Sequence, residues 1–87
     1  MRFVFLYHPE SDHARQVESY AKEFESRGYG SFELISLESK DGAAMAELYD
    51  IVAYPAILAI REGGELQKNW EGDQLPLMSE VASYSMM

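Results

Sequence analysis

The sequence predicts one α/β domain: a four-stranded mixed sheet with helices on both faces, in the order β-α-β-α-β-β-α. Two unbroken apolar runs, at residues 3–7 and 55–60, indicate strands that are buried on both faces. A stretch with helical periodicity follows the first run, and a pair of glycines marks a hairpin after the second. Because 87 residues leave room for one domain only, we treat residues 1–87 as a single unit.

The first strand, residues 3–7, ends at a His-Pro pair. Ser11 or Asp12 is expected to cap the helix that follows, since both side chains accept hydrogen bonds from a first helical turn. Gly28 should end this helix after Arg27. The apolar side chains of its predicted inward face recur at spacings of three and four: Ala14, Val17, Ala21 and Phe24.

Residues 32–37 predict the second strand, and Asp41 is expected to cap a short second helix. Because a helix joins the first two strands, we expect them to be parallel, with a right-handed crossover. The expected inward face of the short helix consists of Met45, Leu48 and Tyr49.

The third predicted strand, residues 55–60, begins with a proline, where a missing N–H does least damage to a ladder. Two glycines then favour a tight hairpin into residues 66–71, the fourth strand. Pro76 suits the first turn of a last helix. That helix is expected to bury Leu77, Met78 and Val81.

Composition excludes several classes of function. Asp and Glu number 15 against 7 Lys and Arg, a net charge of −8, which argues against nucleic acid or an anionic membrane as partner. No stretch is long and apolar enough to predict a membrane span or a signal-peptide core, so the expected location is the cytoplasm. The absence of cysteine excludes disulfides, thiolate metal sites and thiol redox chemistry.

Residues 49–58, Tyr-Asp-Ile-Val-Ala-Tyr-Pro-Ala-Ile-Leu, resemble the Tyr-x-Val-x-x-x-Pro-Thr-Leu segment of the thioredoxin/glutaredoxin superfamily. Residues 61–66, followed by Trp-Glu-Gly at 70–72, resemble the charged glycine turn, last strand and closing glycine of that superfamily. The order of predicted elements is similar over nearly the whole chain. The resemblance implies a thioredoxin-like fold in which Pro55 follows a cis peptide bond.

The sequence departs from this superfamily at its redox motif, and this departure decides which of the superfamily's properties the resemblance implies here. Its members place a Cys-x-x-Cys between the first strand and the first helix, where this chain has no sulfur. One register puts Ser11 and Ala14 at the two cysteine positions, and a register shifted by one puts Glu10 and His13 there. Because disulfide exchange requires an attacking thiolate, we expect no oxidoreductase activity and assign no catalytic residue.

The resemblance also implies a groove between the first helix start, the cis proline and the closing glycine. In the superfamily the backbone before that proline pairs with an extended substrate segment, a contact that needs no cysteine. Our leading hypothesis is therefore a redox-inactive module that binds an extended peptide or a partner protein and needs no cofactor. The residues expected to line the groove are Pro9, Glu10, Ser11, Ala14, Tyr54, Pro55, Gly72 and Asp73.

Other interpretations stay open at this point. Ser11 is either a simple cap or a hydroxyl that holds glutathione or another small thiol, as in the related serine-type glutathione transferases. The cis geometry at Tyr54 either serves a partner or merely holds two loops together. A third hypothesis is a structural subunit that pairs through an edge strand. The group His8, Glu10, Asp12 and His13 matches no defined ligand spacing, so an acidic solvated loop is favoured over a metal or proton-transfer site.

Overall fold

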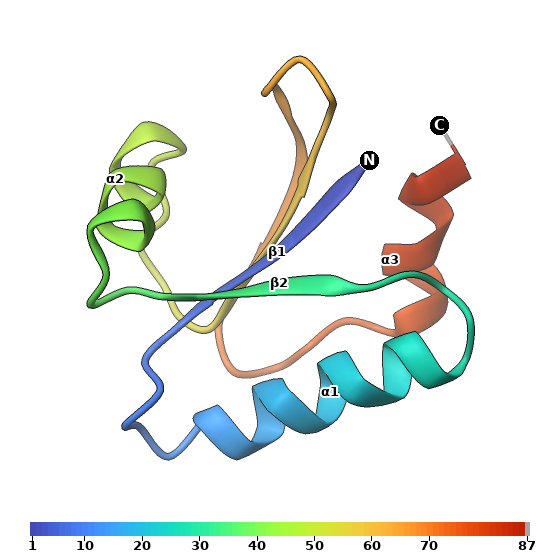
Figure 1. The fold of residues 1–87 in the computed structure, drawn as a ribbon, viewed down its shortest axis with the longest axis horizontal. Helices are drawn as coiled ribbons and strands as arrows, with labels where there is room; N and C mark the ends of the chain where they lie inside the picture. Colours follow the sequence, from blue (N-terminus) through green and yellow to red (C-terminus); the bar gives the residue numbers. More distant parts are fainter. Residues whose placement is uncertain (87) are drawn as a thin grey trace.

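Four strands form one mixed sheet in the order β2-β1-β3-β4 (Figure 1). β1 runs parallel to β2 and antiparallel to β3, and β3 and β4 form an antiparallel hairpin. The α/β class, the mixed sheet and the order of elements predicted from the sequence are confirmed. The computed structural model describes residues 1–86, with these elements: β1 (Arg2–Tyr7), α1 (Ala14–Ser26), β2 (Phe32–Ser36), α2 (Lys40–Leu48), β3 (Ala56–Ile60), β4 (Leu66–Glu71), α3 (Met78–Ser83) and a 3-10 turn (Tyr84–Met86).

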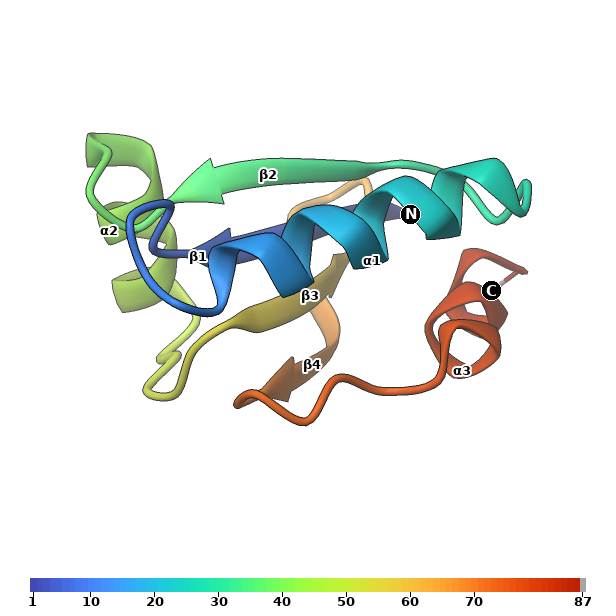
Figure 2. The ribbon, with the colours of Figure 1, turned by 90° about the horizontal axis from the view of Figure 1, so that it is seen from below.

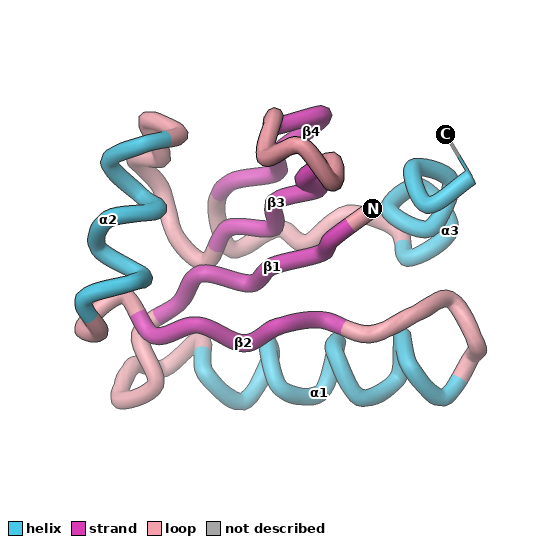
Figure 3. The backbone as a smooth tube through the Cα atoms, turned by 45° about the horizontal axis from the view of Figure 1, so that its top comes forward, coloured by secondary structure: helices cyan, strands magenta, loops and turns pink. Residues whose placement is uncertain are grey.

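Helices cover both faces of the sheet. α1 and α3 pack on one face and α2 on the other, as Figure 2 and the tube in Figure 3 show from two directions. Successive residues of a strand point to opposite faces, so Phe3 and Phe5 of β1 face α1, while Val4 and Leu6 face α2. All 4 phenylalanines and the single tryptophan, Trp70, belong to the cluster on the α1 face.

The start of α1 differs from the prediction. The helix begins at Ala14, the cap position is His13, and that side chain makes no capping hydrogen bond. Ser11 instead donates its N–H and its hydroxyl to the His8 carbonyl, at 3.1 and 2.6 Å, in a turn that precedes the helix. A short polar side chain can bond its own local backbone in this way, and here that turn wins over capping. Neither Ser11 nor Asp12 is therefore the cap.

The end of α1 follows the prediction. Gly28 adopts φ +79°, the left-handed conformation that closes many helices. Its N–H donates to the Glu25 carbonyl at 3.0 Å, and the next N–H, from Tyr29, donates to the Phe24 carbonyl at 3.3 Å. This pair of bonds is a Schellman motif, and it turns the chain back toward β2.

The cap of α2 is Ser39, not Asp41 as predicted. Ser39 has an extended backbone, and its hydroxyl accepts the Gly42 N–H at 3.0 Å. The helix therefore begins directly after Ser39, and Asp41 is already inside it. Asp41 lies in the first turn, where its charge still complements the helix dipole. Gly42 packs against the end of β2: a Cβ at this position would lie 1.9 Å from the Ser36 carbonyl oxygen.

Two apolar residues expected in the core lie outside it. Leu48, the last residue of α2, is 73% exposed, and Leu77, just before α3, is 75% exposed. Both stand at helix ends, where the chain leaves the layer that the helix forms with the sheet. Their neighbours Met45 and Met78 pack against the core as expected, and Val81 is buried. None of the helices among residues 1–86 has the length and apolar character needed to cross a membrane.

Candidate functional site

The candidate site is built around the peptide bond between Tyr54 and Pro55, which is cis. Pro55 is buried at the entrance to β3, and its carbonyl accepts the Gly72 N–H at 3.0 Å. Gly72 follows β4 directly and has φ +104°, a conformation that favours glycine. The fold thus brings together two predicted groove positions, Pro55 and Gly72, that lie far apart in the sequence.

A carboxylate fixes the loop that leads into the cis bond. One oxygen of Glu71 accepts the N–H groups of Val52 and Ala53, at 2.9 and 3.0 Å, while the other accepts the Asn69 side-chain amide at 2.6 Å. Because Glu71 is the last residue of β4, the loop is tied to the sheet edge. The sequence predicts Glu71 only as the last residue of the fourth strand, and its place before the closing glycine is the one signal for this role.

Tyr54 presents unused backbone groups beside this anchored loop. Its hydroxyl donates to the Ile51 carbonyl at 2.9 Å, which holds the half-buried ring against the chain that precedes it. Its backbone N–H and carbonyl form no hydrogen bond within residues 1–86. The nearby Val52 side chain is 81% exposed. The loop therefore offers a backbone donor, a backbone acceptor and an apolar side chain on one short stretch.

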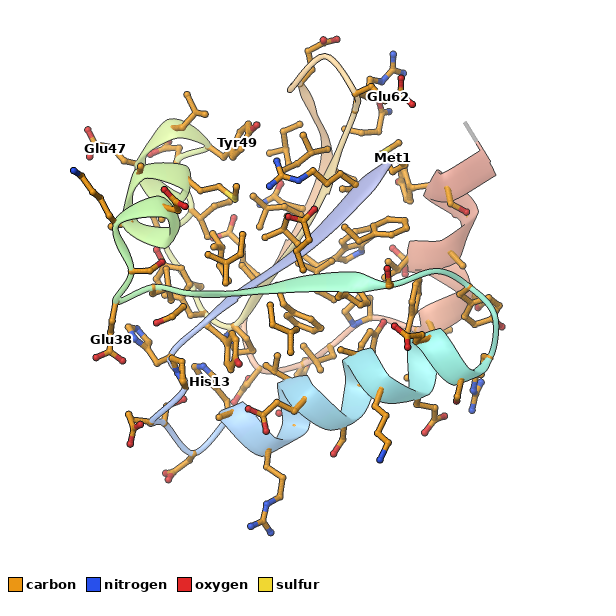
Figure 4. The ribbon with its side chains drawn as sticks, viewed as in Figure 1. Met1, His13, Glu38, Glu47, Tyr49 and Glu62 are labelled. Atoms are coloured by element: carbon orange, nitrogen blue, oxygen red, sulfur yellow. The ribbon has the colours of Figure 1, made fainter. Side chains whose placement is uncertain are left out.

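Two histidines border the cis-proline loop. The His8 N–H donates to Nε2 of His13 at 3.1 Å, and the His8 ring stands edge-on to Tyr54 with the ring centroids 5.8 Å apart. Burial lowers the pKa of His13 and the neighbouring His8 lowers it further, whereas Asp12 and Asp73 act in the opposite direction. A neutral imidazole is what this hydrogen bond requires, since Nε2 must accept. Figure 4 shows His13 at the start of α1.

The remaining predicted residues divide into two groups. Asp73 lies beside α1, and its carbonyl accepts the Gln16 amide at 3.3 Å. Ala14 is buried as the first residue of α1 and offers no surface to a ligand. Pro9 and Glu10 are exposed in the turn before α1 and form no hydrogen bond to the cis-proline loop within the described chain.

The histidines and acidic residues of this turn do not gather in one cluster in the described part of the chain. Among residues 1–86 no three His, Asp or Glu side chains converge so that they could hold an ion. The pair formed by His8 and His13 is instead a structural contact between the end of β1 and the start of α1. The sequence signal is a pair of histidines five positions apart, for which the prediction favours a solvated loop over a metal or proton-transfer site; it does not include a contact between the two histidines.

No protein-family model matches this sequence, and no curated protein matches it either. Among solved structures the chain is similar to thioredoxin 1 from the thermophilic eubacterium Thermosipho africanus, with a TM-score of 0.67. The superposition covers 99% of this chain and 91% of that one, at 9% sequence identity. The chain has a thioredoxin-like fold. Both the resemblance in fold and the missing Cys-x-x-Cys motif are thereby confirmed.

The fold shows what stands at the two positions that the sequence resemblance aligns with the Cys-x-x-Cys motif. In the first register, Ser11 lies in the turn before α1 and Ala14 is the first helical residue. In the shifted register, Glu10 is exposed and His13 immediately precedes the helix. Disulfide exchange requires a thiolate that attacks a disulfide sulfur. Neither register places a thiolate at these positions, because the chain has no cysteine.

Proposed function

We propose that this protein is a binding module without thiol redox chemistry, and that an extended segment of a peptide or partner protein docks along the cis-proline loop. The observation that supports this most directly is the pair of unused backbone groups on Tyr54, next to the exposed side chain of Val52. An extended segment can exchange backbone hydrogen bonds with such a residue, as in strand addition. The apolar side chain adds contact area that water would otherwise cover.

The cis-proline loop is held in place before any partner binds, and this favours its role as a docking surface. Glu71 already holds the N–H groups of Val52 and Ala53, so the docking surface is ordered before a partner arrives. A site that is ordered in advance loses less conformational entropy on binding, and more of the contact energy appears as affinity. The hydrogen bond from the Gly72 N–H to the Pro55 carbonyl also holds this loop against the end of β4.

The alternative of a small-thiol site at Ser11 has less support. The Ser11 hydroxyl donates to the His8 carbonyl at 2.6 Å, so its proton is committed and is not offered to a thiolate. The neighbouring Glu10 and Asp12 are exposed carboxylates that repel an anionic ligand such as glutathione. Titration with millimolar glutathione, followed by amide NMR, should leave the Ser11, Tyr54 and Asp73 signals in place. Shifts at all three would favour the alternative.

The proposed docking site is testable with displayed peptides. A random heptapeptide library is selected on the immobilised protein, and the recovered peptides are titrated into labelled protein. We expect amide shifts at Val52, Ala53, Tyr54 and Gly72. Val52→Lys should weaken binding about tenfold, the equivalent of 1.4 kcal/mol, because it removes an apolar contact at the centre of the surface.

A matched control separates the loop from general surface effects. Leu77→Lys makes the same kind of change at a residue that is 75% exposed, close to the 81% of Val52. Leu77 is far from the cis bond in the sequence and lies just before α3. Peptide affinity should be unchanged in this variant. Equal weakening by both substitutions, or shifts that miss the Val52–Tyr54 stretch, would contradict the proposal.

A further inference from the structure

The outer edge of β2 is free within residues 1–86. β2 pairs with β1 alone, and the two strands form a regular parallel ladder from Phe32 to Ser36. Leu37 donates its N–H to the Tyr7 carbonyl at 2.9 Å. The backbone N–H and carbonyl groups of the odd-numbered residues of β2 therefore point toward β1. By alternation the N–H and carbonyl of Leu34 point away from the sheet. Figure 3 shows β2 as the border strand, alongside α1.

The two edges of the sheet differ in how they are protected. At the β4 edge the register shifts between Ala59 and Ile60, and Lys68 lies on that strand with its ammonium 5.9 Å from the Trp70 ring. A register irregularity and a lysine are common ways in which proteins discourage strand addition. β2 contains neither device. Its only charged residue, Glu33, is neutralised by a two-point ion pair with Arg2, at 2.6 and 2.9 Å.

A hollow flanks β2 on each face of the sheet. The hollow on the α1 face, about 270 Å³, is lined by Phe32, Leu34 and Ala21 among others. The hollow on the α2 face, about 420 Å³, is lined by Ile35 and Met45 and by the exposed Leu48. Leu34 itself is 42% exposed. Apolar side chains of β2 therefore border open space on both sides of its free edge.

This arrangement matches the geometry of an added strand. A strand paired with β2 would lie about 4.8 Å from it and would direct successive side chains to opposite faces. Those side chains would enter the α1 hollow and the α2 hollow in turn. The backbone groups of Leu34 would supply the ladder, while the two hollows would select side chains, as in other cases of β-augmentation.

Charge indicates the chemistry of the occupant. On the α1 side the hollow carries Glu18 and Glu25 against Lys22, and on the α2 side Asp41 stands beside the neutralised pair of Arg2 and Glu33. Both rims are thus acidic, on a chain of net charge −8. A second copy of the same chain would bring like charges together, so a basic segment is the better complement.

We propose that the outer edge of β2 is a second docking site, separate from the cis-proline loop. Its occupant is an extended segment of another protein, with apolar residues at its centre and lysine or arginine at both ends. The segment extends the sheet by one strand and seats its central side chains alternately in the two hollows.

The probe is a blocked seven-residue peptide, Arg-Lys-Val-Leu-Val-Lys-Arg, titrated into labelled protein and followed by amide NMR. We expect shifts at Phe32, Leu34 and Ser36, with slowed hydrogen exchange at the Leu34 amide. Leu34→Lys should raise the Kd at least about tenfold, because it places a positive charge and removes an apolar side chain at the centre of the edge. Val52→Lys, at the cis-proline loop, should leave the Kd unchanged.

A charge-matched pair of variants tests the rim independently of Leu34. Glu25→Lys reverses a charge at the α1 hollow, and Glu62→Lys makes the same reversal in the β3–β4 turn, labelled in Figure 4. Neither substitution lies in β2. We expect the peptide to bind several-fold more weakly to the first variant and nearly normally to the second. The peptide Glu-Glu-Val-Leu-Val-Glu-Glu should bind more weakly than the basic one to the unaltered protein.

Three results would overturn the β2 proposal. The first is an unchanged Kd in both Leu34→Lys and Glu25→Lys. The second is a set of shifts confined to Val52, Tyr54 and Gly72, which would assign the peptide to the cis-proline loop. The third is sedimentation that shows a dimer of this chain, broken by Leu34→Lys and competed by the peptide, which would make a second copy the occupant.

Discussion

Gly42 shows at the level of one residue how closely α2 approaches the sheet. Replacing an ordinary helical glycine by alanine stabilises a helix by about 1 kcal/mol. At Gly42 the new Cβ would lie 1.9 Å from the Ser36 carbonyl oxygen, a backbone atom at the end of β2. We expect Gly42→Ala to destabilise the protein by about 1–3 kcal/mol, as other overpacked sites do. Urea denaturation measures the change, and a gain in stability would contradict the packing described above.

His13 should make stability depend on mildly acidic pH. Its pKa is lowered in the folded chain, chiefly by burial, so the unfolded chain takes up this proton at a higher pH than the folded one. Stability from His13 is therefore present above the unfolded pKa of about 6.5 and is lost as pH falls below it toward the folded value. Protonation also removes the acceptor of the His8 N–H.

Chemical denaturation at pH 7.5 and pH 5.5 tests the role of His13. We expect the unaltered protein to lose stability between these two conditions. The variant His13→Gln keeps a hydrogen-bond acceptor but has no titrating group, so its loss over the same interval should be smaller. Equal losses in the two proteins would show that His13 does not contribute.

Tyr20 links two elements that are distant in the sequence. Its hydroxyl, on α1, donates to the carbonyl of Pro76, just before α3, at 2.9 Å. Burial raises the pKa of Tyr20 to about 12, with a further contribution from Glu80. We expect Tyr20→Phe to cost about 1 kcal/mol at neutral pH, the usual net value of such a hydrogen bond.

The raised pKa of Tyr20 has a signature at alkaline pH. A tyrosine in the unfolded chain ionises near pH 10, before Tyr20 does in the folded state, so its contribution is lost as pH rises from about 10 toward 12. Tyr20→Phe should therefore lose less stability than the unaltered protein between pH 8 and pH 10.5. Tyr29→Phe is the control, since the Tyr29 hydroxyl forms no hydrogen bond within the described chain. The same alkaline loss in all three proteins would contradict this assignment.

At the scale of elements, the sequence predicted the bodies of helices and strands better than their ends. Unbroken apolar runs and helical periodicity follow from which faces are buried, so they identified β1, β3 and α1. Several residues near each helix start can act as caps, and the local backbone conformation and hydrogen bonds at that start decide among them. Ser39 rather than Asp41 caps α2 for that reason. Leu48 and Leu77 stand at helix ends, and their side chains are exposed although periodicity alone predicts them to be buried.

The net charge of −8 should make the whole molecule sensitive to salt. Within residues 1–86 the ion pairs are Arg2 with Glu33 and Arg27 with Glu23, both exposed, so little attraction is lost on screening. Repulsion among the excess carboxylates weakens instead. We expect the thermal midpoint to rise as sodium chloride increases to about 0.5 M. Glu62→Lys replaces one negative charge with a positive one, which changes the net charge from −8 to −6, and it should show a smaller rise. A midpoint that falls with salt would contradict the expectation.

The candidate site could be predicted only in part. The approach of Pro55 and Gly72 followed from the family resemblance, because the order of elements determines which loops meet. The hold of Glu71 on the Val52 loop and the contact between His8 and His13 depend on side-chain directions that no spacing in the sequence reveals. The free edge of β2 required the strand order, which places the second strand of the chain at the border of the sheet.

Because the aromatic residues are shared unequally, tryptophan fluorescence can follow one face of the sheet and not the other. Trp70 and every phenylalanine lie on the α1 face, whereas the core beneath α2 is built around Val4, Leu6 and Leu58. Emission excited selectively from tryptophan therefore reports the layer formed by α1 and α3. Methyl resonances of the aliphatic core report the α2 layer. Heating the protein under both probes would reveal whether the two layers melt as one cooperative unit or whether α2 detaches first.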